Sequence, residues 1–144
     1  MALAPARPAV LVTGTASDSH TWNLVLLQLF LEELGHPVSN LGACVTHELL
    51  VDGCRRHRPE VVVIGSVNGH GYRDGLAAVT LLRAEPDLAG MRVVVGGKLG
   101  VDGVRSLQDR GRLLAAGCDA VFDDGSLTAL REFLAALPAR VVTA

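Results

Sequence analysis

The sequence predicts an α/β fold, built as a doubly wound parallel sheet of five strands with helices on both faces. Short apolar runs alternate along the chain with longer segments whose apolar residues recur at helical spacing. Three of the short runs, at 10–12, 61–64 and 93–95, are apolar without interruption, which is typical of parallel strands covered on both faces. Because five strand–helix units with right-handed crossovers commonly give the strand order 2-1-3-4-5, we expect that order.

Turn and cap residues mark the boundaries between these elements. Gly35 and Gly117 follow the first and fourth helical segments, where glycine is suited to end a helix. Thr46 and Ser126 are suited to cap the second and fifth helices, and Pro138 follows the last one. We therefore expect strands at 8–13, 37–41, 60–65, 91–96 and 119–123, and helices at 21–34, 46–57, 73–85, 103–116 and 127–137. The residues of the last helix expected to face the sheet are Leu127, Leu130, Phe133, Leu134 and Leu137.

Length and composition indicate one globular domain over residues 1–144, with its core at about 8–137. Of the 144 residues, 49% are hydrophobic and 19% are charged, so the chain can bury a core and is not disordered. The net charge of -2 and the scattered basic residues argue against nucleic acid or an anionic membrane as a partner.

Cysteine usage and the lack of long apolar segments favour a cytoplasmic location. The apolar runs are far shorter than the roughly 20 residues that a membrane helix needs. The N-terminus has no charged region, apolar stretch and cleavage site in the order of a signal peptide. Three cysteines, Cys44, Cys54 and Cys118, cannot all pair internally, which fits free thiols in a reducing compartment.

Polar or glycine-rich turns follow four of the five predicted strands. In the first of them, the Asp18 carboxylate can accept a hydrogen bond from one nitrogen of His20 and leave the other nitrogen free for a metal. A sheet of this order binds ligands beyond the carboxyl ends of its strands, between strands one and three. The Asp18–His20 turn and the turn at 65–71 flank that point, and further turns lie at 96–100 and 123–126.

The order of these motifs resembles the cobalamin-binding fold, which is flavodoxin-like (Rossmann-type), and is most similar to the small subunit of glutamate (methylaspartate) mutase. An Asp-x-His is followed by Ser-x-x-Gly-x-Gly, a Gly-Gly pair and an aromatic residue with a Gly-Ser, from about 10 to 134. The resemblance implies the cofactor-binding subunit of an isomerase, which is inactive alone. It also implies that adenosylcobalamin is shared with a separate barrel-type large subunit that binds the substrate, whose carbon skeleton is rearranged by a radical.

The resemblance assigns a role to each motif. It makes His20 the cobalt ligand in place of the nucleotide base, with Asp18 as its hydrogen-bonded partner. Gly96 and Gly97 would let the nucleotide tail pass close to the backbone. The cofactor-binding candidates are Thr15, Ser17, Asp18, His20, Thr21, Trp22, Asn23, Gly65, Ser66, Val67, Gly69, His70, Gly96, Gly97, Phe122, Asp123, Gly125 and Ser126. The residues implied to lie near the corrin and the partner subunit are His70, Tyr72 and Arg73.

Two positions depart from the pattern of the family. Asn23 stands where family members have a glycine that leaves space beside the nucleotide tail, and it could cap the helix or hydrogen-bond the tail. Gly65 stands where a serine often contacts the benzimidazole, and it opens room that Asn23 could partly refill. We therefore expect a nucleotide-tail site that differs from that of close relatives.

Other interpretations remain open beside a mutase subunit. The chain could be a stand-alone cobalamin carrier or sensor. It could also be a flavin-binding electron carrier, although Tyr72 is the sole aromatic near the expected flavin. Asp18 taken alone would be a helix cap beside an exposed histidine. A phosphate receiver is disfavoured because the third strand ends in Gly65-Ser66 and not in an aspartate.

The Cys-x-x-His spacing of the pairs Cys44–His47 and Cys54–His57 suggests a zinc site. On a helix, however, His47 and Cys54 would lie ~10.5 Å apart along the axis, whereas zinc ligands lie ~2.0–2.3 Å from one centre. We therefore expect Cys54 to pack in the core and these histidines to lie on the surface.

Overall fold

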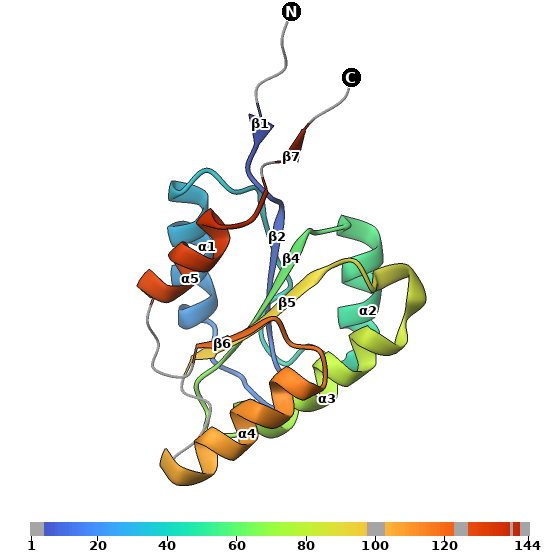
Figure 1. The fold of residues 1–144 in the computed structure, drawn as a ribbon, viewed down its shortest axis with the longest axis vertical. Helices are drawn as coiled ribbons and strands as arrows, with labels where there is room; N and C mark the ends of the chain where they lie inside the picture. The colour runs from blue at the N-terminus through green and yellow to red at the C-terminus, as the bar shows by residue number, and fades with distance from the viewer. Residues whose placement is uncertain (1–4, 98–102, 123–126, 139, 142–144) are drawn as a thin grey trace, which may run out of the picture.

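A parallel sheet of five strands forms the centre of the molecule, and helices cover both of its faces (Figure 1). The computed structural model describes residues 5–97, 103–122, 127–138 and 140–141. The strands of the sheet are β2 (Val10–Gly14), β3 (Val38–Asn40), β4 (Val61–Ser66), β5 (Arg92–Gly97) and β6 (Ala120–Phe122). They lie in the order β3-β2-β4-β5-β6, and every neighbouring pair is parallel. Counted along the chain this is the order 2-1-3-4-5, so the predicted sheet is confirmed.

The helices that connect the strands lie in two layers. They are α1 (Trp22–Glu33), α2 (His47–His57), α3 (Gly71–Ala84), α4 (Gly103–Ala115) and α5 (Leu127–Ala135). Figure 1 shows α1 and α5 on one face of the sheet, and α2, α3 and α4 on the other. Each predicted strand and helix has a counterpart whose ends differ from the prediction by two residues or fewer.

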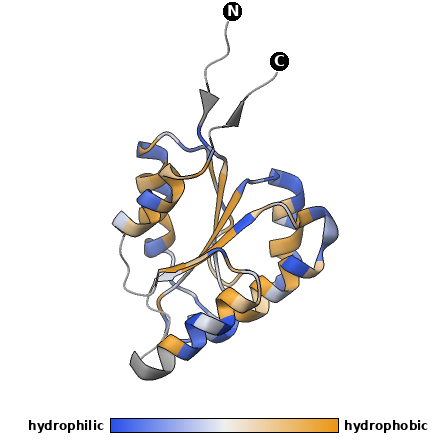
Figure 2. Ribbon diagram, in the orientation of Figure 1, coloured by the Kyte–Doolittle hydropathy of each residue, from blue (hydrophilic) through white to orange (hydrophobic). Residues whose placement is uncertain are grey.

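Alternate side chains of the strands pack into two hydrophobic cores, one on each face of the sheet. In β2, Val10 and Val12 pack with residues of α1 and α5, whereas Leu11 packs with residues of α2 and α3. The side chains of β4 are divided in the same way. Figure 2 shows the sheet as a mostly hydrophobic layer between helices that also carry hydrophilic residues. Because both faces are covered, the central strands need uninterrupted apolar sequences, as the prediction assumed.

The predicted caps stand at the helix ends. The Thr46 hydroxyl accepts the Leu49 backbone N–H at 3.2 Å and begins α2. Gly35 after α1 and Gly117 after α4 have φ angles of +93° and +111°, which glycine adopts without strain. Ser126, the predicted cap of the last helix, lies outside the described residues.

Three short elements were missing from the prediction because they are too short to show a hydrophobic period. They are the antiparallel pair β1 (Pro5–Ala6) and β7 (Arg140–Val141), and a 3₁₀ turn at Pro86–Leu88. In α5, Leu130 and Leu134 are buried as predicted, but Leu127 is 39% exposed at the first turn. Within the described ranges, no helix is long and apolar enough to span a membrane.

Candidate functional site

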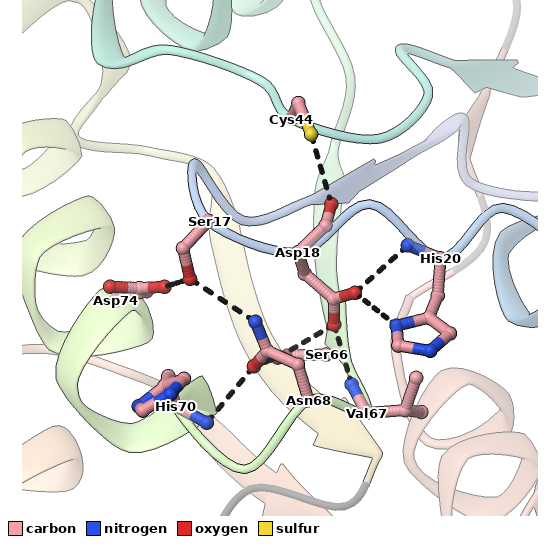
Figure 3. Close-up of polar contacts among 9 residues, drawn as sticks. All are labelled: Ser17, Asp18, His20, Cys44, Ser66, Val67, Asn68, His70 and Asp74. Atoms are coloured by element: carbon pink, nitrogen blue, oxygen red, sulfur yellow. Dashed lines mark hydrogen bonds and ion pairs between the residues drawn. The ribbon is translucent and has the colours of Figure 1, made fainter.

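The buried carboxylate of Asp18 joins the carboxyl ends of β2 and β4 (Figure 3). Its Oδ1 accepts the His20 backbone N–H at 2.9 Å and lies 2.6 Å from the imidazole Nδ1 of His20. Its Oδ2 accepts the Ser66 hydroxyl at 3.0 Å and the Val67 backbone N–H at 2.7 Å. The Asp18 main-chain oxygen accepts the Cys44 backbone N–H at 3.0 Å. We call Asp18, His20, Ser66 and Val67 the Asp18 clamp.

The hydrogen bonds of the clamp keep Asp18 ionised. Burial by itself would raise the pKa of this carboxyl, because the charged form loses its hydration. The hydrogen bonds from His20, Val67 and Ser66 outweigh burial and lower the pKa to about 2. An ionised carboxylate can only accept hydrogen bonds, so the proton shared with His20 belongs to the imidazole Nδ1. In the neutral imidazole this tautomer leaves the Nε2 lone pair available.

His20 stands at the open side of the clamp. Its side chain is 59% exposed, and Figure 3 shows the ring with Nδ1 turned to Asp18 and Nε2 turned away. A hollow of about 440 Å³ lies against it, lined by Ser19, His20, Thr21, Trp22, Asn23 and Val67. A histidine fixed in one tautomer by a carboxylate, with its other nitrogen exposed, has the arrangement of an oriented metal ligand.

A second ring of polar contacts surrounds the clamp on the side of α3 (Figure 3). The Ser17 hydroxyl donates to Asp74 and accepts the Asn68 amide at 3.2 Å. The Asn68 amide oxygen accepts the backbone N–H of His70 at 2.9 Å. Gly69 has a φ of +86°, which lets the chain turn between these two residues. This ring ties the β2–α1 turn to the start of α3.

A smaller, mostly apolar cavity of about 220 Å³ lies next to the clamp, between the sheet and the helices α1 and α5. Val67 and Asn23 line both this cavity and the hollow at His20, so the two spaces adjoin. Its floor comes from the carboxyl ends of β4, β5 and β6. The lining residues are Asn23, Leu26, Leu27, Val63, Gly65, Val67, Gly96, Gly97, Phe122, Leu127 and Leu130.

Glycines let the backbone form that floor. At Gly97, φ is +112° and a Cβ would lie 2.1 Å from the backbone oxygen of Ser66, so no other residue fits without a shift. At Gly96, a Cβ would lie 3.3 Å from the Phe122 backbone oxygen. The Gly-Gly pair therefore has a steric reason inside the sheet, independent of any ligand.

The two departures from the family pattern meet in this cavity. A Cβ at Gly65 would lie 3.5 Å from the Asn23 amide nitrogen, and 3.3 Å from a methyl group of Leu24. The Asn23 side chain therefore fills part of the space that Gly65 leaves, together with Leu24 and Leu27. Among the described residues, two buried side-chain polar atoms have no hydrogen-bond partner, namely Asn23 Oδ1 and Thr15 Oγ1.

The structure thus gathers most of the predicted site residues in one region. Thr15 is buried just after β2, Thr21 precedes α1 without a capping side-chain bond, and Trp22 is 78% exposed at the start of α1. Asp123, Gly125 and Ser126 lie outside the described residues. Sequence reasoning missed the partners from other elements, which are Cys44, Asn68, Asp74 and the apolar lining residues of α1 and α5. Local motifs could not point to them, because long-range packing brings them to the site.

The alternative in which Asp18 is only a helix cap is excluded, since Thr21 occupies the cap position of α1 and the Asp18 carboxylate accepts hydrogen bonds from Ser66 and Val67. One expectation from the sequence is corrected. Tyr72 is 7% exposed and packs in the core, so its ring is not free to contact a partner subunit. The same burial removes the aromatic side chain that a flavin would need. His70 and Arg73 are exposed.

The structure confirms the positions expected for the residues of the zinc interpretation. Cys54 is fully buried in the core, and burial raises the pKa of its thiol to about 11, which disfavours the thiolate that zinc requires. His47 and His57 lie on the surface, as predicted. Among the residues that the structure describes, no group of three or more metal-binding side chains is found.

Comparison with known proteins gives a family and a fold. Residues 8–130 match the family model described as the B12 binding domain. The chain is 30% identical over 119 residues to glutamate mutase sigma subunit 1 of Haloarcula marismortui, covering 81% of this chain and 76% of that protein.

Solved structures share the fold at low sequence identity. A cobalamin-binding protein from Desulfitobacterium hafniense DCB-2 superposes with a TM-score of 0.69 at 20% identity, over 88% of this chain. This chain spans 59% of the length of that protein. The receiver domain of the sensor histidine kinase PA1611 from Pseudomonas aeruginosa has a TM-score of 0.63 at 17% identity, over 90% of this chain and 95% of that one. The fold alone therefore does not distinguish these functions.

Proposed function

This chain belongs to the B12-binding domain family, together with the glutamate mutase sigma subunits, and on that premise we propose that it is the cobalamin-binding subunit of an adenosylcobalamin-dependent carbon-skeleton mutase. It would hold the cofactor at the carboxyl edge of the sheet and present it to a separate catalytic subunit of barrel type, which binds the substrate. When bound, adenosylcobalamin supplies a carbon radical through homolysis of its cobalt–carbon bond.

The residues at the edge of the sheet fit such a cofactor. His20 would coordinate cobalt through Nε2, in place of the nucleotide base of the cofactor. Asp18 would act as a positioning residue, because its Oδ1 lies 2.6 Å from Nδ1 and this hydrogen bond fixes the ring. The ionised carboxylate also makes the imidazole a more basic ligand.

The displaced nucleotide tail would occupy the cavity between the sheet and the helices α1 and α5. Its apolar lining suits an aromatic base, and the close-packed Gly96–Gly97 backbone leaves no side chain in the way. The polar ring of Ser17, Asn68 and Asp74 would stay at the rim of the site.

The observation that carries the proposal is the pairing of two features at one edge. An exposed histidine is fixed by an ionised carboxylate, and a glycine-floored apolar cavity adjoins it. A metal ligand alone or a cavity alone would suit many ligands. Together they suit a metal complex that carries an aromatic tail.

The proposal is tested by cofactor retention and reconstitution. The purified chain is incubated with cobalamin or with a flavin and then passed through gel filtration. We expect cobalamin to be retained, with the visible spectrum of a displaced nucleotide base, and no flavin to be retained. Rearrangement of glutamate in the presence of adenosylcobalamin should appear only after a glutamate mutase catalytic subunit is added. Loss of cobalamin on the column would contradict the binding role, and turnover by the chain alone would contradict the two-subunit role.

Cobalamin that is retained while candidate catalytic subunits give no turnover would instead favour a stand-alone cobalamin carrier or sensor.

A further inference from the structure

The outer face of α1 carries an exposed apolar stripe. Trp22, Leu26 and Leu29 recur at helical spacing on one side of the helix and are 78%, 62% and 58% exposed. Glu33 continues the same side by one more turn and is also exposed. We call these four residues the α1 stripe. Single exposed apolar residues are common on protein surfaces, but a continuous stripe of large ones marks an interaction surface.

The charge pattern of α1 differs from that of the other helices. The helices α2, α3, α4 and α5 each carry residues of both signs, whereas the only charged residues of α1 are Glu32 and Glu33 in its last turn. Within the described residues, the Thr21 side chain makes no capping bond, and the first turn of α1 has no acidic residue. An acidic group is favourable at the start of a helix and unfavourable at its end, because of the helix dipole. Taken alone, α1 therefore carries its charges at the wrong end.

We propose that the α1 stripe is a self-association surface, on which a second copy of this chain packs its own α1 in antiparallel orientation. The stripe residues are four, three and four positions apart, so their spacing reads the same in both directions. Antiparallel pairing about a twofold axis then places Leu26 against the partner's Leu29, and Leu29 against the partner's Leu26. At the two ends of the pair, Trp22 meets the partner's Glu33.

The antiparallel arrangement corrects the charge pattern at both ends of the helix. Glu33 of each copy comes to the start of the partner's α1, where the first backbone N–H groups have no side-chain cap among the described contacts. The acidic group then lies at the positive end of a helix dipole, and the contact occurs twice because the pair is symmetric. An apolar middle with an acidic end and an uncapped start therefore fits a second α1 as its occupant.

The small size of the surface sets the strength of the dimer. With its 12 residues, α1 is roughly 18 Å long. Stable, specific interfaces bury about 1,200 Å² or more in total, which exceeds what two such helices can cover. The dimer is therefore weak and depends on concentration. Leu29 and Glu33 are absent from the described lining of the hollow at His20 and of the cavity between the sheet and the helices α1 and α5, which we call the nucleotide-tail cavity. The inference thus stands independently of the proposed function.

Sedimentation equilibrium of the full chain tests the self-association, without cofactor or catalytic subunit and at concentrations up to about 1 mM. At that concentration, a dimer with a dissociation constant of about 1 mM would contain half of the chains. Trp22 is the only tryptophan of the sequence, so its fluorescence is followed in the same samples. We expect the average mass to rise toward that of a dimer with concentration. The emission of Trp22 should shift to shorter wavelength over the same range, because its ring becomes covered.

Two variants test which surface pairs and in which orientation. Leu29→Glu should raise the dissociation constant about ten-fold or more, because it places a carboxylate against an apolar side chain twice in each dimer. The matched control is Leu107→Glu, at an exposed leucine of α4 on the opposite face of the sheet (Figure 1), which should leave the constant unchanged. Glu33→Lys should raise the constant about five-fold, although a lysine at the end of α1 favours the helix within each copy.

Three results would overturn the inference. The first is a mass that stays that of a monomer at about 1 mM; if Leu29→Glu then weakens binding to a catalytic subunit, the stripe belongs to that partner. The second is a dimer that Leu29→Glu affects no more than Leu107→Glu does. The third is a dimer that Glu33→Lys strengthens or leaves unchanged, because the two helices would then not be antiparallel. Cobalamin retention by the chain is measured separately, so failure of the dimer leaves the proposed function standing.

Discussion

The Asp18 clamp and the nucleotide-tail cavity adjoin each other, but they differ in how complete they are without a ligand. In the clamp, each oxygen of a buried carboxylate faces two hydrogen-bonding groups. In the cavity, the buried oxygen of Asn23 has no partner. The clamp is therefore set in place by the fold, whereas the cavity is an open space with a mostly apolar lining. In the proposed function, the clamp positions the metal ligand and the cavity binds the nucleotide tail.

The largest effect is expected where the floor of the cavity is most constrained. Gly97→Ala should lower the free energy of unfolding by about 3 kcal/mol or more, because it adds strain at a φ of +112° and a Cβ 2.1 Å from the Ser66 oxygen. Chemical denaturation measures the change. Gly90→Ala is the matched control, since its Cβ would meet nothing within 4 Å, and it should change stability by less than about 0.5 kcal/mol. Equal stability of the two variants would mean that the backbone at Gly97 can shift to admit a Cβ. The floor of the cavity would then not be constrained as described.

The clamp itself is tested by Asp18→Asn. The amide nitrogen would replace one acceptor and face the donors of the clamp, so cobalamin affinity should fall roughly 10-fold while the fold is kept. The pKa of Asp18 is lower in the folded protein, at about 2, than in the unfolded chain, so its stabilisation is present above pH 4 and is lost as the pH falls toward 2. The stability advantage of the wild type over Asp18→Asn should therefore shrink by about 2 kcal/mol between pH 5 and pH 2. A pH-independent difference would show that the charge of Asp18 is not what the clamp stabilises.

The smallest effect is expected at the outer polar ring. Ser17→Ala removes contacts with Asp74 and Asn68 near the surface, and it should cost about 1 kcal/mol or less in stability. Cobalamin affinity should change by less than about three-fold, which titration of the same samples measures. A loss of cobalamin affinity as large as that of Asp18→Asn would mean that Ser17 belongs to the clamp.

The fold could be predicted from the sequence because its signals are local. The uninterrupted apolar runs define the central strands, and Thr46, Gly35 and Gly117 mark helix ends. The burial of Tyr72 was not predicted, since its neighbours Gly71 and Arg73 give no clue to which side of α3 faces the core.

The site could be predicted only in part. The spacing of Asp18 and His20 predicted their contact, because two residues apart in a turn can meet. The donors that satisfy the second oxygen of Asp18 come from Ser66 and Val67, 48 and 49 residues away, and local patterns do not reveal such pairs. The meeting of Asn23 and Gly65 was suggested by the family pattern, but the missing partner of the Asn23 oxygen depends on how the whole cavity packs.

The central claim is that His20 binds cobalt, and electron paramagnetic resonance of the bound Co(II) form tests it most directly. Protein labelled with ¹⁵N-histidine should change the nitrogen splitting from three lines to two, and His20→Ala should abolish that splitting. His70→Ala, a histidine at the same edge whose side chain is exposed, should leave it unchanged. A splitting that persists in His20→Ala, or that follows isotopic labelling of the cofactor's own base, would contradict the assignment.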